Sequence, residues 1–186
     1  MPVLRIRKRK RLPHWEADGA VYFVTFRLAD SLPQSVLASP EFTCGQGTEA
    51  ARKRFRAAER WLDRGAGACY LRVTEVAALV ANTLEKFAGS RYRLFAWCIM
   101  PNHVHTVFQP YCPYKLAPIL HSWKSYSALS ANKILNRSGP FWQREYYDHL
   151  IRNGDQLARA IRYTAENPIK AKLKNWKWVY VSKDWT

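Results

Sequence analysis

The triplet His103-Val104-His105 is the pattern in this sequence with the clearest chemical content. In a β-strand, residues i and i+2 point to the same face. The two imidazoles would then project side by side, and Val104 would anchor the opposite face in the core. Paired neutral imidazoles suit a divalent cation when a third ligand and open positions complete its shell. The same triplet also occurs as surface or hydrogen-bonded histidines, so by itself it indicates a candidate ligand pair.

A second segment, residues 141–149, is rich in aromatic and titratable side chains. If it is helical, Tyr146 and His149 lie at i and i+3 on one face. A tyrosine hydroxyl titrates near ~10 in water and becomes a nucleophile at neutral pH only when its phenolate is stabilised. A neighbouring metal would neutralise a scissile phosphate, and His149 is then a candidate third ligand. Asp148 is an alternative ligand or a residue that orients a histidine. The competing interpretation is a packed aromatic helix in which Tyr146 and Tyr147 are core or rim residues.

Charge is the unusual feature of the composition. Thirty Lys and Arg face fourteen Asp and Glu, which gives a formal net charge of +16. Such an excess repels itself in a folded domain and favours a polyanionic partner, either nucleic acid or an anionic membrane. No apolar run approaches the ~20 residues of a membrane-spanning helix, and the basic N-terminus lacks the apolar stretch of a signal peptide. Four scattered cysteines without a CxxC pair indicate reduced thiols. We therefore expect a cytoplasmic, nucleoid-associated protein with a nucleic-acid partner and no membrane partner.

The elements that must position these residues follow from hydrophobic periodicity and turn signals. The expected strands are 20–28, 92–100 and 103–108, and the expected helices are 49–64, 74–89, 116–135 and 155–167. The aromatic segment 141–152 is interpreted as helical from about residue 144 when Tyr146 and His149 are placed on one face. This order predicts an α+β fold, with an antiparallel sheet and helices packed mainly on one face.

Cations, hydroxyls and aromatic rings in the same segments predict a surface for single-stranded nucleic acid. The candidate contacts are Arg7, Lys8, Arg9, Lys10, Arg11, Arg52, Arg56, Lys124, Ser125, Arg144 and Arg152. The basic N-terminal segment is either a phosphate-contacting arm or a disordered tail. Trp123 is either a stacking platform or a core residue.

Several motifs together resemble one known family. They are residues 100–105 (MPNHVH), residues 142–152 (WQREYYDHLIR), and Tyr163 with Asn167-Pro168, supported by residues 11–15, 22–28 and 122–125. Their order and spacing resemble those of the REP-associated tyrosine transposases, which belong to the HUH single-strand endonucleases together with the IS200/IS605-type (Y1) transposases. The resemblance covers nearly the whole chain.

The resemblance implies a ferredoxin-like (RRM-like) sheet and a divalent metal, Mg²⁺ or Mn²⁺. It implies cleavage of single-stranded DNA that leaves a 5′-phosphotyrosine and a free 3′-hydroxyl, at hairpins formed by repetitive extragenic palindromes. Carried over to this sequence, it makes His103 and His105 metal ligands, Tyr146 rather than Tyr147 the nucleophile, and His149 the third ligand.

We accordingly expect a basic arm (1–18), a catalytic domain (19–170) and a basic aromatic tail (171–186), acting as a monomer or homodimer. The alternative is a non-catalytic protein of RRM-like fold that binds structured DNA or RNA.

Overall fold

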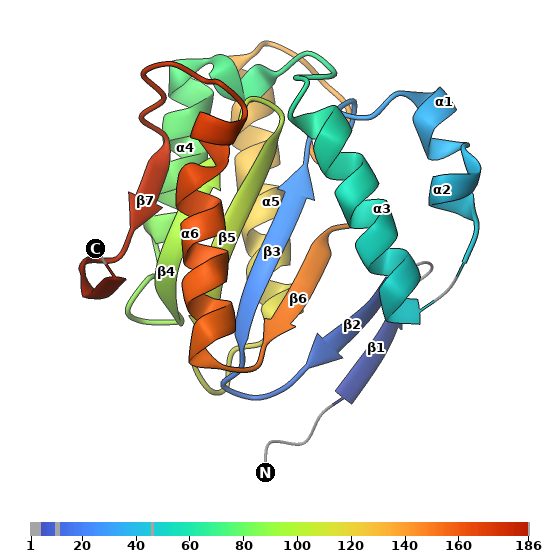
Figure 1. The fold of residues 1–186 in the computed structure, drawn as a ribbon. Coiled ribbons are helices and arrows are strands. Elements are labelled where there is room, and N and C mark those ends of the chain that lie inside the picture. Colours follow the sequence, from blue (N-terminus) through green and yellow to red (C-terminus); the bar gives the residue numbers. More distant parts are fainter. Residues whose placement is uncertain (1–4, 10–11, 46, 186) are drawn as a thin grey trace.

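The computed structural model describes residues 5–9, 12–45 and 47–185, with the backbone alone described for residues 5–9 and 12–16 (Figure 1). The strands are β1 (Arg5–Arg9), β2 (Leu12–Glu16), β3 (Val21–Arg27), β4 (Tyr92–Ile99), β5 (His103–Pro110), β6 (Tyr147–Ile151) and β7 (Val179–Val181). The helices are α1 (Gln34–Leu37), α2 (Pro40–Thr43), α3 (Gly47–Leu62), α4 (Thr74–Glu85), α5 (Leu116–Ile134) and α6 (Gly154–Lys170), with 3₁₀ turns η1 (Tyr70–Arg72) and η2 (Lys183–Trp185).

The main sheet has the strand order β6-β3-β5-β4-β7, and all neighbouring strands are antiparallel. Along the chain, β3, α4, β4, β5, α5 and β6 form a βαββαβ unit, which is consistent with the ferredoxin-like arrangement. The predicted α+β class and antiparallel sheet are confirmed. The described part of the basic N-terminal segment forms a separate hairpin of β1 and β2.

One face of the sheet packs against α4 and α5 around a large apolar core. Alternate residues of the central strands, including Phe26, Val104 and Phe108, point into it, as the period of two along a strand requires. Trp123 of α5 is 2% exposed and its indole N–H donates to the hydroxyl of Tyr92 at 3.1 Å. Trp123 is therefore a core residue and does not offer a stacking surface.

The opposite face of the sheet is also covered, by α6, which lies in front of the central strands in Figure 1, and by α3, which lies beside β3 and β6. Its strand residues include Phe23, Phe95 and Val107, and they pack against Ile161 of α6 and Phe55 of α3. We expected helices mainly on one face. The second set of alternate strand positions is apolar as well, so this face also has to be shielded from water.

The prediction of a helix from residue 144 was wrong, because residues 147–151 form strand β6 at the edge of the sheet. In β6, Tyr147 stands opposite Thr25 of β3, and His149 stands opposite Phe23. Residues three apart in a strand point to opposite faces. Tyr146 and His149 therefore do not share a face as they would in a helix.

A bulge precedes β6. The amide of Gln143 donates to the carbonyl of Arg27 at 2.8 Å, and Tyr147 pairs with Thr25. Residues 144–146 therefore lie together opposite Phe26, the single residue between Thr25 and Arg27 in β3. Extra residues of this kind leave carbonyls without ladder partners. The ammonium group of Lys124 on α5 donates to two of them, the carbonyls of Gln143 and Arg144, at 2.7 and 2.9 Å.

The C-terminal part differs from expectation in two details. Helix α6 contains Pro168 and ends at Lys170, whereas we expected Pro168 to end it. The tail then supplies β7, which pairs with β4. Among the described residues, no helix is long and apolar enough to cross a bilayer.

Candidate metal centre and nucleic-acid groove

His103 and His105 lie on β5 and project to the sheet face that α3 and α6 cover, as their spacing predicts. Both side chains are fully buried. Their Nε2 atoms are 2.9 Å apart. Two neighbouring ligands of an octahedral ion with bonds of ~2.1 Å lie ~3 Å apart. The separation of the two imidazoles therefore suits a shared divalent cation.

The hydrogen bonds around His103 fix its orientation. Asn102 donates its side-chain N–H groups to the carbonyls of Leu62 and Ala66, at 3.2 and 2.8 Å. Its Oδ1 is then the acceptor for Nδ1–H of His103, at 2.7 Å. With the proton on Nδ1, the lone pair on Nε2 is free for a metal.

His105 is held in a similar way. Its Nδ1 lies 2.7 Å from the hydroxyl of Thr25, which can accept the Nδ1–H proton and leave Nε2 free. Burial lowers the pKa of His103 to about 3 and lowers the pKa of His105 well below its usual value, with His103 adding to the effect. Both rings are therefore neutral at pH 7, which is the state that binds metals.

Glu59 of α3 completes the cluster. Ligand atoms of Glu59, His103 and His105 all lie within 4.8 Å of one another. Glu59 Oε1 lies 3.8 Å from Nε2 of His105 and is buried without a hydrogen-bond partner. Burial, together with the nearby Asp63, raises the pKa of Glu59 to about 8. A buried carboxyl oxygen without a hydrogen-bond partner, beside two imidazole Nε2 atoms 2.9 Å apart, fits a divalent cation, which would favour the ionised form of Glu59.

His149, the expected third ligand, is not part of this cluster. It lies on β6, which pairs with β3, so two strand spacings separate it from β5. Each spacing is ~4.8 Å. Burial and the neighbouring Arg52 and Arg152 lower the pKa of His149, so it lies beside the basic residues of the groove described below. The spacing argument for His149 assumed a helix, whereas these residues form strand β6.

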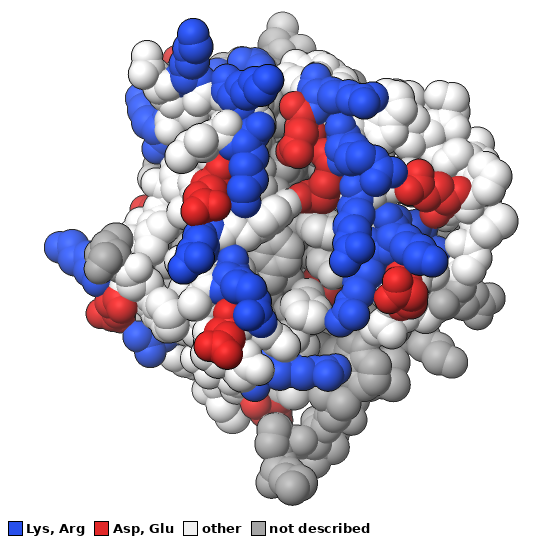
Figure 2. All heavy atoms as spheres, viewed as in Figure 1, with Lys and Arg blue, Asp and Glu red and all other residues white. Residues whose placement is uncertain are grey.

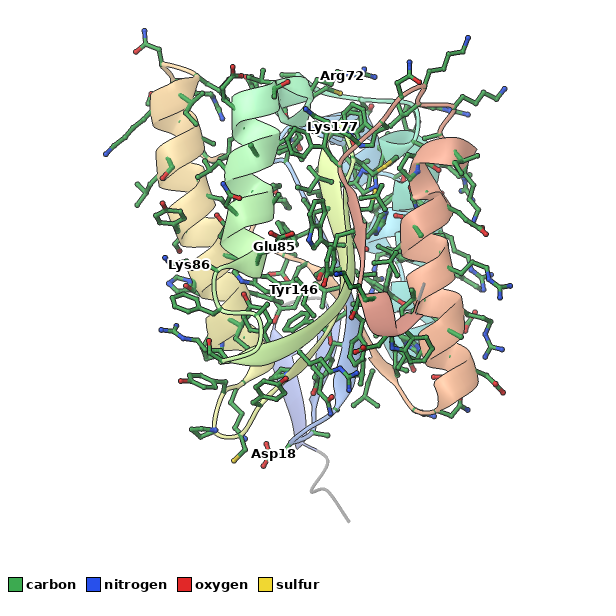
Figure 3. All side chains as sticks on the ribbon, turned by 90° about the vertical axis from the view of Figure 1, so that its left-hand side faces the viewer. Asp18, Arg72, Glu85, Lys86, Tyr146 and Lys177 are labelled. Atoms are coloured by element: carbon green, nitrogen blue, oxygen red, sulfur yellow. The ribbon has the colours of Figure 1, made fainter. Side chains whose placement is uncertain are left out.

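Tyr146, the expected nucleophile, is 7% exposed and belongs to the core on the α4–α5 side. The ammonium group of Lys124 on α5 lies 5.8 Å from its ring centroid. Figure 3 shows Tyr146 on that side of the sheet, across from α6. Its neighbour Tyr147 faces the other way, and its ring stacks on Phe55 with centroids 3.9 Å apart. Burial raises the pKa of Tyr147.

Tyr163 of α6 lies on the same side of the sheet as the cluster. Its ring centroid is 5.5 Å from that of His105 and 5.7 Å from that of Phe23. The ammonium group of Lys170 lies 4.9 Å from its ring centroid. Asn167, one helical turn beyond Tyr163 and so on the same face, is 3% exposed.

Sequence reasoning assigned no role to Glu59, Tyr163 or Asn167. A signal for the last two was available, because both belong to a motif of the family resemblance and are spaced i, i+4 on a predicted helix. Glu59 gave a weaker signal, as an acid in a helix whose charged residues are mostly basic.

Lys and Arg side chains gather over α3 and α6, on either side of a hollow in the surface (Figure 2). The exposed cations are Arg52, Lys53, Arg56 and Arg60 on α3 and Arg159, Arg162 and Lys170 on α6. We call the hollow between these helices the basic groove. Arg52 and Arg56 act against the larger effect of burial by lowering the pKa of Tyr147, which places both side chains near that residue.

The other predicted DNA contacts differ in how exposed their side chains are. Arg144 and Arg152 flank β6 and are exposed, as is Ser125 on α5. Lys124 is half-buried and holds the bulge before β6. Arg7, Lys8 and Arg9 lie on β1, whose side chains are not described, and Lys10 and Arg11 lie outside the described residues.

Comparisons with known proteins agree on one family. A family profile described as "Transposase IS200 like" matches residues 73–167, just over half of the chain. A Haemophilus influenzae protein provisionally named a REP-associated tyrosine transposase is 28% identical over 123 residues, which cover 61% of this chain and 65% of that protein. The chain thus matches slightly less than two thirds of the length of this relative.

A solved structure of a REP-associated tyrosine transposase bound to a REP hairpin has the same fold. It superposes with a TM-score of 0.55 at 14% identity, over 93% of this chain and 80% of that chain.

Proposed function

Because the chain belongs to the IS200-like transposase family, we propose that it cuts and rejoins single-stranded DNA at hairpins formed by REP-like palindromes. The observation that carries this proposal is Tyr163 on α6, whose ring lies 5.5 Å from that of His105 in the Glu59–His103–His105 cluster. A phenol beside a candidate metal centre in a basic groove is suited to transfer of a DNA phosphate.

In the proposed reaction, Tyr163 is the nucleophile in place of Tyr146. Its Oη forms a bond to the scissile phosphorus, and the bond from phosphorus to the 3′-oxygen breaks. The phenol proton passes to solvent and the departing 3′-oxygen takes up a proton, giving a 5′-phosphotyrosine and a free 3′-hydroxyl. Attack of a 3′-hydroxyl on the phosphotyrosine reverses these changes and rejoins a strand. Lys170, which also pairs with Glu166 at 3.3 Å, adds a cation 4.9 Å from the Tyr163 ring centroid.

His103, His105 and Glu59 would hold the divalent cation, Mg²⁺ or Mn²⁺, and Asn167 is a candidate for a further oxygen ligand. When bound, the cation neutralises charge on the scissile phosphate and helps to align it. The chain itself supplies neutral imidazoles, fixed by Asn102 and Thr25.

The basic groove would hold the DNA. Exposed Arg and Lys side chains on α3 and α6 neutralise phosphates. Near Arg52 and Arg56 lie the stacked rings of Phe55 and Tyr147, and bases can stack on aromatic rings of this kind.

The test is formation of a covalent complex. The protein is incubated with end-labelled hairpin oligonucleotides that carry single-stranded flanks, with Mn²⁺ or with a chelator. We expect a labelled band on a denaturing gel at the mass of protein plus DNA, only with metal. Binding without any such band across the hairpin panel would instead support the alternative of a non-catalytic nucleic-acid-binding protein.

A further inference from the structure

A cavity of about 170 Å³ lies between the α1–α3 segment and the edge of the sheet. Its apolar walls include Leu32, Leu37 and Phe42. Thr25 also lines it, and the hydroxyl of Thr25 bonds to Nδ1 of His105 at 2.7 Å. The cavity therefore adjoins the candidate metal centre through Thr25 of β3, which pairs with the histidine strand β5.

The size of the cavity limits its ligand. Pockets that take drug-sized molecules commonly measure ~300–1,000 Å³, so this cavity suits a single heterocycle. Phe55 and Tyr147, whose rings stack on each other, form part of its lining. Aromatic rings of this kind bind the flat faces of nucleobases.

Polar groups lie among these apolar walls. Arg27 lines the cavity and donates to the hydroxyl of Ser31 at 3.0 Å. Burial lowers the pKa of Arg27 to about 10, so it is still a cation at neutral pH. Glu145, in the bulge before β6, also lines the cavity, and its Oε2 is buried without a hydrogen-bond partner. A buried acceptor of this kind is costly unless a ligand supplies a donor.

We propose that this cavity binds one unpaired base of the DNA strand held in the basic groove, with Arg27 donating to ring or carbonyl acceptors and Glu145 accepting from an exocyclic amine. This inference rests on the proposed function, since it assigns a base-reading pocket to the same DNA-binding surface. Guanine, adenine and cytosine carry an exocyclic amine and thymine does not. The pocket should therefore discriminate against thymine at one position of the single strand.

The test is selection from a pool of hairpin oligonucleotides whose single-stranded flank is randomised, carried out with a chelator so that no strand is cut. We expect one flank position to be depleted of thymine when the wild-type protein is used. Replacing the preferred base by thymine or by an abasic site should weaken binding about tenfold, the size of one good base contact. In Glu145→Gln, which keeps the shape of the side chain, the preference at that position should change or vanish.

Leu37→Trp fills the cavity and should remove the same preference while leaving binding to the hairpin stem. Ile134→Trp, which adds the same ring at an exposed position outside the cavity lining, is the matched control and should select the wild-type flank. Circular dichroism checks that each variant is folded.

Wild-type, Glu145→Gln and Leu37→Trp proteins that all select the same flank would overturn the pocket assignment and leave the proposed function intact. A wild-type protein that enriches no sequence and binds no hairpin would overturn both.

Discussion

Oδ1 of Asn102 lies 2.7 Å from Nδ1 of His103, and the same side chain donates to the carbonyls of Leu62 and Ala66. Leu62 ends α3, the helix that carries Glu59. A single amide thus joins the end of α3 to the histidine strand. It sets both the tautomer of one expected ligand and the position of the helix that supplies another.

Asn102→Ala should therefore weaken metal binding about 10–100-fold, as expected for loss of a residue that orients a metal ligand. Titration calorimetry with Mn²⁺ measures this change. Asn102→Asp is the informative partner, because a carboxylate still accepts from His103 but cannot donate to the two carbonyls. It should retain metal affinity better than Asn102→Ala while still lowering the free energy of unfolding. Equal metal affinity in the wild-type protein and Asn102→Ala would contradict the positioning role.

The raised pKa of Glu59 predicts an unusual dependence of stability on pH. Because its pKa is about 8 in the folded protein and near 4.3 in the unfolded chain, the folded state binds more protons between these values. Stability must then fall as pH rises. The lowered pKa values of His103 and His105 act in the opposite direction, but only below about pH 6.5.

Between pH 6.5 and 8, the effect of Glu59 on the free energy of unfolding should therefore be measurable without a contribution from the two histidines. The free energy of unfolding of the metal-free protein should decrease by about 1–2 kcal/mol, measured by urea denaturation. Glu59→Gln should flatten this slope. Mn²⁺ should flatten it as well, because a cation holds Glu59 in its ionised form. An unchanged slope in Glu59→Gln would show that Glu59 is already ionised in the folded protein.

The side chain of Lys124 stabilises the bulge before β6. The sequence placed it among the DNA contacts, but its ammonium group donates to the carbonyls of Gln143 and Arg144 in the bulge before β6. Lys124→Met should lower the free energy of unfolding by about 2 kcal/mol, since hydrogen bonds to charged groups contribute ~1.5–3 kcal/mol. It should leave the salt dependence of DNA binding nearly unchanged.

Arg56→Gln, on the exposed face of α3, is the matched comparison. It should leave stability nearly unchanged and reduce the slope of log K against log salt by about 0.7–0.9, the value of one phosphate contact. Fluorescence anisotropy with a labelled hairpin at several salt concentrations measures this slope. A larger loss of slope for Lys124→Met than for Arg56→Gln would restore Lys124 as the phosphate contact.

The parts of the structure that were predictable are those in which local pattern and packing agree. The strand of His103 and His105 is rich in β-branched and aromatic residues (Val104, Thr106, Val107 and Phe108), and helices α4 and α5 have clear apolar periodicity, so their positions follow from the sequence. The helix predicted for residues 144–149 does not form. The charged and aromatic residues of this segment fit the period of a helix and the period of a strand equally well, so the pattern does not decide between them. Pairing with β3, a contact distant in sequence, decides its conformation. Glu59 and Tyr163 reach the histidines only through the packing of α3 and α6, which periodicity does not determine.

The central claim is that Tyr163, on the helix above the histidines, attacks the DNA. The most direct measurement compares Tyr163→Phe, Tyr146→Phe and Tyr147→Phe for formation of a denaturation-resistant protein–DNA complex in the presence of Mn²⁺, with hairpin binding measured in parallel. We predict that Tyr163→Phe binds the hairpin and forms no covalent complex, whereas Tyr146→Phe and Tyr147→Phe still form it. A covalent complex that persists in Tyr163→Phe and disappears in Tyr146→Phe would contradict this assignment and establish Tyr146 as the nucleophile.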